Sequence, residues 1–250
     1  MQIPEFPNLI YYAIPVFIAT VIIEVILTVK VKMEEYEYKD AATSIAMGLG
    51  NVAIGLISKV MVLGVFYLVY NSFHLFEIPF TWWAWILVLF AEDMTYYWYH
   101  RISHENRFFW ASHIVHHSSQ KYNLSTALRQ TWTGSFTFNT PSHHRVHHAT
   151  NPQYLDRNHA GIFIIWDRIF GSFEPEIEKP IYGLTTNIHT FNPIKVAFLE
   201  WFGLFKDVFT SKTSVFNKLK YFLKPPGWKH DGTGILATDM RKEWEKNQQK

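Results

Sequence analysis

The chain has 250 residues and a formal net charge of +2, so its total charge points to no particular class of partner. It contains no cysteine, which excludes disulfide bonds, cysteine-ligated zinc and cysteine nucleophiles. Any metal site must therefore use histidine and carboxylate ligands. The length suits one large domain or two small ones and is sufficient to bury a core.

The charge is unevenly distributed along the chain. Residues 1–100 hold four basic and nine acidic side chains, whereas residues 101–250 hold nineteen basic and twelve acidic ones. A basic second half could contact nucleic acid or an anionic membrane surface. The apolar segments of the first half favour the membrane, and we expect no nucleic-acid partner.

Three apolar segments predict about three membrane spans within residues 1–99. Residues 9–29 are apolar except for Glu24, and about 20 helical residues cross a bilayer core. Residues 42–70 predict either one long tilted helix or an interfacial helix followed by a span. Residues 80–99 carry Trp and Tyr at both ends, as spans often do at the two membrane interfaces.

The basic residues predict an orientation for these spans. Residues 1–29 and 71–100 contain no Lys or Arg, while residues 30–41 contain three lysines and basic residues are frequent after Tyr99. Because cytoplasmic loops are enriched in Lys and Arg, we expect the N-terminus outside and the rest of the chain in the cytoplasm. We divide that remainder into a histidine-cluster catalytic region, 100–225, and a polar tail, 226–250. The predicted fold is an all-α integral membrane protein with a cytoplasmic, histidine-rich metal domain.

Three carboxylates lie in or near the predicted spans. Glu24, Glu92 and Asp93 are functional candidates, because burying a charge in a membrane is costly. Glu92 and Asp93 could equally lie at the headgroup end of their helix. Further on, residues 194–209 have helical apolar spacing, which suits an interfacial helix or a helix packed on the protein's own core. We expect PPGW at 225–228 to end the last regular element, with a polar tail that is a solvated helix or disordered.

Histidines are concentrated in one region of the chain. Ten of the thirteen fall between residues 100 and 159, and nine of these form the clusters HRISH, HIVHH and HHRVHH. Residues three and four apart share one helix face, so the histidines of each cluster point the same way. Neutral imidazole is the commonest metal ligand, and eight imidazoles exceed what one tetrahedral ion can hold. Two ions are the economical interpretation, and Zn, Fe, Cu and Ni all suit imidazole. We interpret His74, His189 and His230 as ordinary surface or core residues.

The first cluster directly follows the third predicted span. This position predicts a metal site at the membrane surface, where a lipid could enter from the bilayer. A membrane metal transporter is a competing hypothesis, although its ligands would normally lie within the spans.

These motifs resemble the fatty acid hydroxylase and sterol desaturase superfamily, whose signature is HxxxH, HxxHH and HxxHH. Residues 93–130, 139–176 and 182–196 resemble its alkylglycerol monooxygenase-like branch well beyond the histidines. The resemblance implies a di-iron lipid monooxygenase that hydroxylates or desaturates a C–H bond with O2. Zinc could take the place of iron in purified protein. The electron donor is unknown, a protein or a pterin, with tetrahydrobiopterin as the donor that the branch implies.

The resemblance also implies roles for individual residues. The implied metal ligands are His100, His104, His113, His116, His117, His144, His147 and His148. Glu105 matches an acidic residue that the branch requires. Flanking positions that could orient imidazoles are Asp93, Tyr122, Asn123, Asn158 and His159. His143 lies one residue before the family pattern, and we do not expect it to be a ligand.

The chain departs from the family near residues 131–138. Family members carry a long apolar segment there, with further membrane helices and usually another metal-site histidine. The eight residues present here reach at most about 28 Å when extended, which is too short to cross a bilayer and return. The departure implies an alternative function, a membrane protein that binds metal but is catalytically impaired.

Overall fold

The computed structural model describes residues 10–31, 37–75, 77–79, 81–128 and 141–248. Residues 131–138, where the sequence departs from the family, lie outside this part of the chain. Within the described part, the structure is helical and contains no strand, only one isolated bridge between Ala149 and Tyr182. The all-α prediction is therefore confirmed. The helices are α1 (Ile10–Val31), α2 (Tyr38–Phe73), α3 (Trp82–Glu105), α4 (Arg107–His117), η1 (Leu124–Leu128), α5 (Pro141–His147), η2 (Pro152–Tyr154), α6 (Ile165–Phe170), α7 (Pro193–Thr210), α8 (Val215–Leu223) and α9 (Ala237–Gln248).

Two of the described helices are long and apolar enough to cross a membrane, within Tyr11–Thr28 and Tyr38–Phe73. Residues 42–70 thus form part of one continuous helix rather than two. At about 1.5 Å per residue α2 is about 54 Å long, which exceeds a hydrocarbon core of about 30 Å. Its first turns bury Asp40, Thr43, Ser44 and Met47 inside the protein, whereas its apolar side chains beyond Asn51 are exposed.

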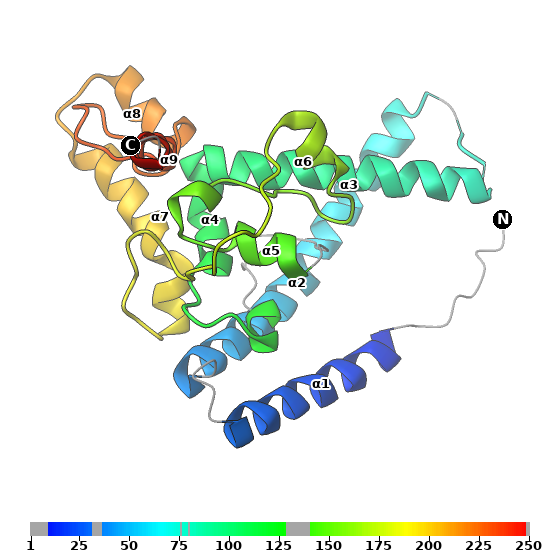
Figure 1. Cartoon of the computed structure of the whole chain (residues 1–250). Helices are drawn as coiled ribbons and strands as arrows, with labels where there is room; N and C mark the ends of the chain where they lie inside the picture. The colour runs from blue at the N-terminus through cyan, green and yellow to red at the C-terminus, as the bar shows by residue number, and fades with distance from the viewer. Residues whose placement is uncertain (1–9, 32–36, 76, 80, 129–140, 249–250) are drawn as a thin grey trace.

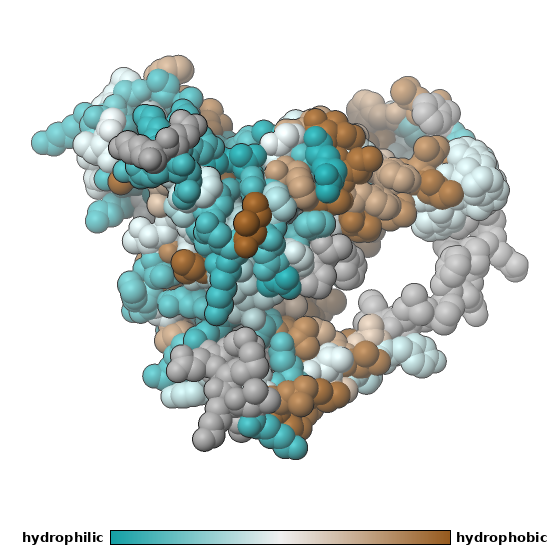
Figure 2. Space-filling model, in the orientation of Figure 1, coloured by the Kyte–Doolittle hydropathy of each residue, from teal (hydrophilic) through white to brown (hydrophobic). Residues whose placement is uncertain are grey.

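The exposed apolar surface gathers on α1, the outer part of α2 and the first half of α3. Figure 2 shows hydrophobic side chains over α1 and α3, while the face near the C-terminus is largely hydrophilic. An apolar surface of this size on one side of a protein marks contact with lipid or with another protein. The two membrane-capable helices form much of this surface, which suits contact with a lipid bilayer.

α4 lies at the centre of the compact region and packs against α3, α7 and α8 (Figure 1). One core cluster joins α2, α4 and α7 through Met47, Val115, Val196 and Ala197. A second joins α4, α7 and α8 through Ala111, Leu204, Val208 and Tyr221. Burial of these small and branched side chains stabilises the helices that hold the site.

α7 covers the predicted helix at 194–209. Asn192 caps its N-terminus by accepting from the Lys195 backbone N–H, and Pro193 occupies the first turn. One apolar face packs on the core, as just described, while Phe202 and Phe209 on another face are exposed. One face of α7 is therefore packed on the protein's own core, as one of the two alternatives predicted. A second apolar face is exposed.

PPGW at 225–228 does not end regular structure, because α9 follows it. Of the two alternatives expected for the tail, a solvated helix and disorder, the structure shows the helix. The Asp239 carboxylate accepts the Leu236 backbone N–H at the start of this helix, and α9 packs against η2. An acidic residue in the first turn also suits the helix dipole. The tail is thus an ordered helix with no buried residue, lying against the histidine region.

Candidate metal centre

Five buried histidines converge from three helices. His100 and His104 are one turn apart on α3, His113 and His117 one turn apart on α4, and His147 ends α5. One ring nitrogen from each lies within 4.8 Å of all the others. The Nε2 atom of His113 is 3.0 Å from that of His100 and 3.1 Å from that of His117. We call these residues the five-histidine group, and their nitrogens could hold one metal ion.

Three more histidines form a second group next to the first. The Nε2 atom of His148 lies 3.0 Å from that of His116 and 2.9 Å from that of His144. The ring centroids of His117 and His148 are 4.4 Å apart, so the two groups share a boundary. We call this the three-histidine group. An ion bound by three imidazoles would keep coordination positions open, as catalytic metal sites do.

α4 contributes to both groups and is firmly anchored. The Asn106 side chain accepts the Phe108 backbone N–H and so caps the start of α4. The Arg107 guanidinium donates to Glu200 at 2.8 Å and to Asp207 at 2.6 Å, both on α7. With its first turn fixed in this way, the HxxHH spacing directs histidines from the last two turns into both groups.

Outer hydrogen bonds orient three imidazoles of the five-histidine group. Nδ1 of His100 donates to the backbone carbonyl of His159 at 2.7 Å, and Nδ1 of His147 to that of Arg157 at 2.9 Å. Nδ1 of His104 lies 3.3 Å from the Asp156 carboxylate. A proton held on Nδ1 leaves the Nε2 lone pair free for a metal. Nε2 of His104 is buried without a hydrogen-bond partner, which is the state expected of a ligand atom.

Asp167 is a site residue that the sequence analysis did not single out. Its buried carboxylate accepts the backbone N–H groups of His159 and Ala160, each at 2.8 Å, and the Ser172 hydroxyl at 2.6 Å. It thereby fixes the carbonyl that receives the His100 proton. Burial raises the pKa of this carboxyl above its ordinary value. A charged residue directly after the apolar run IFIIW was the one sequence signal of its burial.

Two of the three carboxylates predicted in or near the spans accept hydrogen bonds from backbone N–H groups. Asp93 accepts the backbone N–H groups of Ile162 and Phe163, at 2.5 and 2.9 Å, and the Trp166 indole N–H at 2.8 Å. It therefore holds the loop after His159 rather than an imidazole. Glu24 accepts the Leu124 backbone N–H at 2.9 Å and ties α1 to η1. Glu92 is exposed.

The other flanking residues fall in different places. The Tyr122 ring lies 5.6 Å from His148 and stacks on Tyr182, beside the three-histidine group. The Asn123 side chain, just before η1, accepts from the backbone N–H and the hydroxyl of Ser125 in η1. Glu105 pairs with Arg101 and is half exposed.

Asn158 and the remaining histidines lie outside the two groups. The amide of Asn158 donates to the Glu174 carbonyl at 2.8 Å and to that of His143 at 3.4 Å. The His143 ring packs against Phe173, so the structure does not bring it into either group. The others are His74, His189 and His230, none of which belongs to a metal-binding group among the described residues. His159 is buried beside the five-histidine group without joining it.

Burial keeps the imidazoles neutral. It lowers the pKa of His144 to about 3, and the nearby charge of His116 acts in the same direction. Burial likewise lowers the pKa of His113, His117 and His148 well below the ordinary value. Only neutral imidazole has a free lone pair, so the site is prepared for metal at neutral pH.

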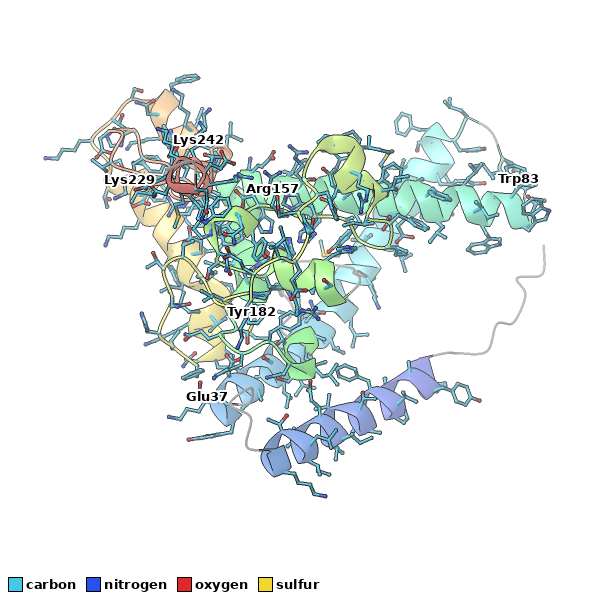
Figure 3. The ribbon with its side chains drawn as sticks, in the orientation of Figure 1. Glu37, Trp83, Arg157, Tyr182, Lys229 and Lys242 are labelled. Carbon is cyan, nitrogen blue, oxygen red and sulfur yellow. The ribbon has the colours of Figure 1, made fainter. Side chains whose placement is uncertain are left out.

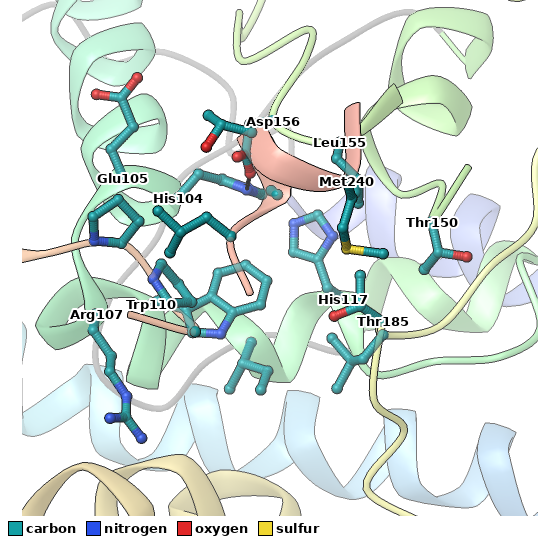
Figure 4. Close-up of a pocket in the computed structure, with 18 of the residues that line it drawn as sticks. His104, Glu105, Arg107, Trp110, His117, Thr150, Leu155, Asp156, Thr185 and Met240 are labelled. Carbon is teal, nitrogen blue, oxygen red and sulfur yellow. Dashed lines mark hydrogen bonds and ion pairs between the residues drawn. The ribbon is translucent and has the colours of Figure 1, made fainter. Parts of the chain in front are cut away.

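A cavity of about 670 Å³ opens beside the five-histidine group. His104 and His117 line it from α3 and α4, and the Trp110 indole lies next to both imidazoles (Figure 4). The opposite wall comes from the C-terminal part of the chain, including Trp228 and Met240. Together, the two histidine groups, this cavity and the apolar helices define a membrane-associated polyhistidine metal protein.

Comparison with known proteins places this class in a family. The fatty acid hydroxylase model matches residues 85–138 and 126–172. An alkylglycerol monooxygenase of Danio rerio is 36% identical over 273 residues, covering 90% of this chain and 61% of the relative. The Homo sapiens enzyme of that name is 35% identical with the same coverage, and the Caenorhabditis elegans one is 35% identical over 78% of this chain and 50% of its own length. No solved structure matches. The chain belongs to the fatty acid hydroxylase family, in an alkylglycerol monooxygenase-like branch.

The same comparisons bear on the predicted departure. The Danio rerio alignment has 273 positions, more than the 250 residues of this chain, so the relative holds residues that have no counterpart here. The two stretches matched by the family model overlap at 126–138, around the predicted departure. The chain spans 61% of the length of the first two relatives.

Proposed function

We propose that this protein is a membrane-bound di-iron oxygenase that hydroxylates a lipid C–H bond with O2. The observation that carries the proposal is the convergence of eight imidazoles, seven of them buried, into groups of five and three. The exposed apolar helices next to this site support a substrate that arrives from the bilayer. The relatives named alkylglycerol monooxygenase support oxygen insertion into a lipid.

In this proposal each histidine group holds one ion. Iron is favoured because five imidazoles exceed the four ligands of a tetrahedral zinc site, although zinc could occupy the site in purified protein. Iron would supply the oxygen activation that no side chain can provide. The protein's own residues would bind the ions, orient the imidazoles and keep water from the reacting C–H bond.

The flanking residues would serve this site from around it. The His159 carbonyl would fix the His100 ring, and Asp93 would hold the loop after His159 in place. The Tyr122 ring would cover one side of the three-histidine group. Asn123, which accepts from the Ser125 backbone N–H, would hold the turn that carries Tyr122. Glu105 lines the cavity and would add negative charge at its opening.

The proposed topology follows the predicted division of the chain. Residues 1–99 would form the membrane region with three spans, 100–225 the catalytic region and 226–250 the tail. The N-terminus would lie outside and the histidine groups in the cytoplasm. Partners would then be the membrane, a lipid from it and an electron donor, either a protein or a pterin such as tetrahydrobiopterin.

The test is oxygen-dependent hydroxylation in membranes that contain the protein. Membranes are supplied with lipid, reductant and labelled dioxygen, and the products are analysed for a labelled hydroxyl group. The proposal expects label in lipid, and none when His116→Ala replaces the wild-type chain. Absence of label with the iron-loaded wild-type chain under every donor would overturn it.

A second candidate function is favoured by the residues that the relatives have and this chain lacks. In that alternative, the chain keeps its eight histidines and binds metal, for example zinc, without oxygen chemistry. Label in the lipid would exclude it, whereas metal-loaded protein without label would support it.

A further inference from the structure

An apolar segment of the histidine region lies along α3. It comprises residues 161–170, GIFIIWDRIF, which form α6 and the turn before it, and we call it the α6 segment. The Phe163 ring stacks on Phe90, with ring centroids 4.7 Å apart. At the other end, the Phe170 ring centroid lies 4.9 Å from that of Trp98. The α6 segment therefore contacts α3 over about two helical turns, or about 12 Å.

These contacts place the α6 segment at a defined depth in the proposed third span. Aromatic residues at 82–85 and 96–99 mark the two ends of this span in the proposed topology. Phe90 lies between them, about 12 Å from the start of α3, and a hydrocarbon core is about 30 Å thick. Figure 3 shows Trp83 at the outer end of α3, across the molecule from Lys242 on α9. The α6 segment thus extends from the middle of the span to its cytoplasmic end.

Three isoleucines of the α6 segment are exposed on one side of it. The exposed fractions of Ile162, Ile165 and Ile169 are 45%, 49% and 60%. Their spacing of three and four residues suits a single face. Figure 2 shows hydrophobic side chains over α6 that continue onto α3. A continuous apolar surface of this kind marks a contact. Because it continues along the exposed face of a proposed span, lipid is the occupant that it suits.

The turn before α6 has protein partners for its backbone. Non-helical backbone at membrane depth is tolerated only where its polar groups are bonded within the protein. The buried Asp93 carboxylate accepts the backbone N–H groups of Ile162 and Phe163, at 2.5 and 2.9 Å. It also accepts the Trp166 indole N–H at 2.8 Å. A Cβ atom added at Gly161 would lie 2.7 Å from the Asp93 carboxylate, so the turn packs directly on α3.

The two charged residues of the α6 segment do not oppose contact with lipid. Asp167 is fully buried and accepts backbone N–H groups, as described above. Arg168 is exposed, and its guanidinium lies 4.0 Å from the centre of the Phe173 ring. It comes two residues before Phe170, which contacts the cytoplasmic end of the proposed span. A long basic side chain at that level can reach the headgroups.

We propose that the α6 segment inserts into the cytoplasmic leaflet and presents Ile162, Ile165 and Ile169 to the acyl chains of bilayer lipids. This inference rests on the proposed function and its topology, in which α3 is the third span. Ile162 comes three residues after His159, whose carbonyl orients the His100 ring. The α6 segment would thus hold the five-histidine group against the leaflet from which a lipid substrate is drawn.

The chain contains no cysteine, so single cysteines can be labelled selectively. The test variants are Ile165→Cys and Ile169→Cys. Ile177→Cys is the matched control, because Ile177 is 79% exposed and lies between two glutamates. Leu87→Cys, at an exposed position of α3, is the reference for lipid. All four side chains are exposed, so none of these cysteines removes a core contact.

Each variant is expressed as the full chain, loaded with zinc, labelled with a nitroxide and reconstituted into phosphatidylcholine vesicles. Electron paramagnetic resonance then measures relaxation of the label by O2, which concentrates in hydrocarbon, and by a water-soluble nickel chelate. We expect the labels at 165 and 169 to behave like the label at 87. The nickel chelate should relax them at least about tenfold less than the label at 177, because hydrated solutes are excluded from hydrocarbon.

Three results would overturn the inference. The first is equal relaxation by nickel at 169 and 177, which would place the α6 segment in water. The second is protection of 165 and 169 from both reagents, which would indicate contact with a second copy or another protein. The third is a label at 87 that lies in water, which would remove α3 as a span.

Hydroxylation by the iron-loaded wild-type chain, measured with labelled dioxygen as above, separates this inference from the proposed function. Hydroxylation together with labels in water at 165 and 169 would overturn the inference and leave the proposed function standing. Labels in lipid at both positions without hydroxylation would uphold the inference and overturn the proposed function.

Discussion

His147 and His143 lie on the same short helix and differ in their surroundings. His147 joins the five-histidine group, whereas His143 packs against Phe173. His147→Ala should lower the bound metal from about two ions per chain toward one, because a group that loses a ligand binds its ion more weakly. His143→Ala is the control and should leave the metal content unchanged. Metal analysis of both variants decides, and equal losses would contradict the assignment of the groups.

Asp167 provides a prediction about positioning. Asp167→Asn keeps the shape but replaces one of the two acceptor oxygens by an NH2 group, so one of the backbone N–H groups of His159 and Ala160 loses its acceptor. Since such outer partners typically change metal affinity by about 10–100-fold, we expect metal to be lost to a chelator at a correspondingly lower concentration. The exposed Asp231→Asn is the control. A wild-type chelator profile for Asp167→Asn would show that this carboxylate does not position His100.

The buried histidines predict a pH dependence for the metal-free protein. The pKa of His144 is about 3 in the folded state against an ordinary value of 6.5. Between these values the unfolded chain binds a proton that the folded chain does not, so stability falls as pH falls below about 6.5. The slope approaches about 1.4 kcal/mol per pH unit for each such histidine. Urea unfolding at pH 8, 6.5 and 5 measures it, and stability that rises toward pH 5 would refute the prediction.

At the level of single residues, most of the site could be predicted from the spacing of the histidines along the chain. The spacing of the histidines on α3 and α4 is a local property, so eight candidates could be named and all fall into the two groups. Asp167 could not be predicted, because its role depends on how the loop at 159–160 folds back on α6. The function of Asp93 as a backbone acceptor depends on the same loop.

At the scale of elements, the junction of α2 with η1 leaves little room for a larger side chain. A Cβ atom added at Gly48 would lie 2.9 Å from the Leu128 carbonyl oxygen, whereas one at Gly55 would meet nothing within 4 Å. Gly48→Ala should therefore destabilise the protein by about 1–3 kcal/mol, while Gly55→Ala should be neutral or stabilising. Thermal unfolding in detergent compares the two, and equal melting temperatures would contradict this packing.

The outer part of α2 gives a prediction about the membrane. Val62 is exposed within the apolar stretch of this helix. Val62→Asp should reduce membrane insertion of α2 by about 3 kcal/mol, because an acidic residue at the centre of a span is costly. Val62→Leu is the control. A glycosylation-tag insertion assay reports the difference, and equal insertion of both variants would argue against α2 as a span.

The positions of helices along the chain could be predicted better than the residues at which they end or the elements against which they pack. Apolar length and the Pro193 start signal predicted α1, α2 and α7. The apolar segment 42–70 could not be assigned to one helix or two, because the burial of its first turns against η1 and α7 involves residues distant in sequence. α9 begins at Ala237, after the predicted stop at 225–228, and it packs against η2, which is distant in sequence.

At the scale of the whole molecule, the protein divides into an apolar side and a polar side with the histidine groups between them. The exposed faces of α1, α2 and α3 suit a bilayer, and the cavity under α9 opens on the polar side. In the proposed function, a lipid would approach the histidine groups from the apolar side.

Metal content and identity of the detergent-purified protein test this account most directly. Expressed with iron and purified without chelator, the wild-type chain should hold about two ions per molecule, with iron predominant, and should lose them with its fold intact when dialysed against a chelator. Folded protein that binds no metal after incubation with Fe²⁺ or Zn²⁺ would contradict the account.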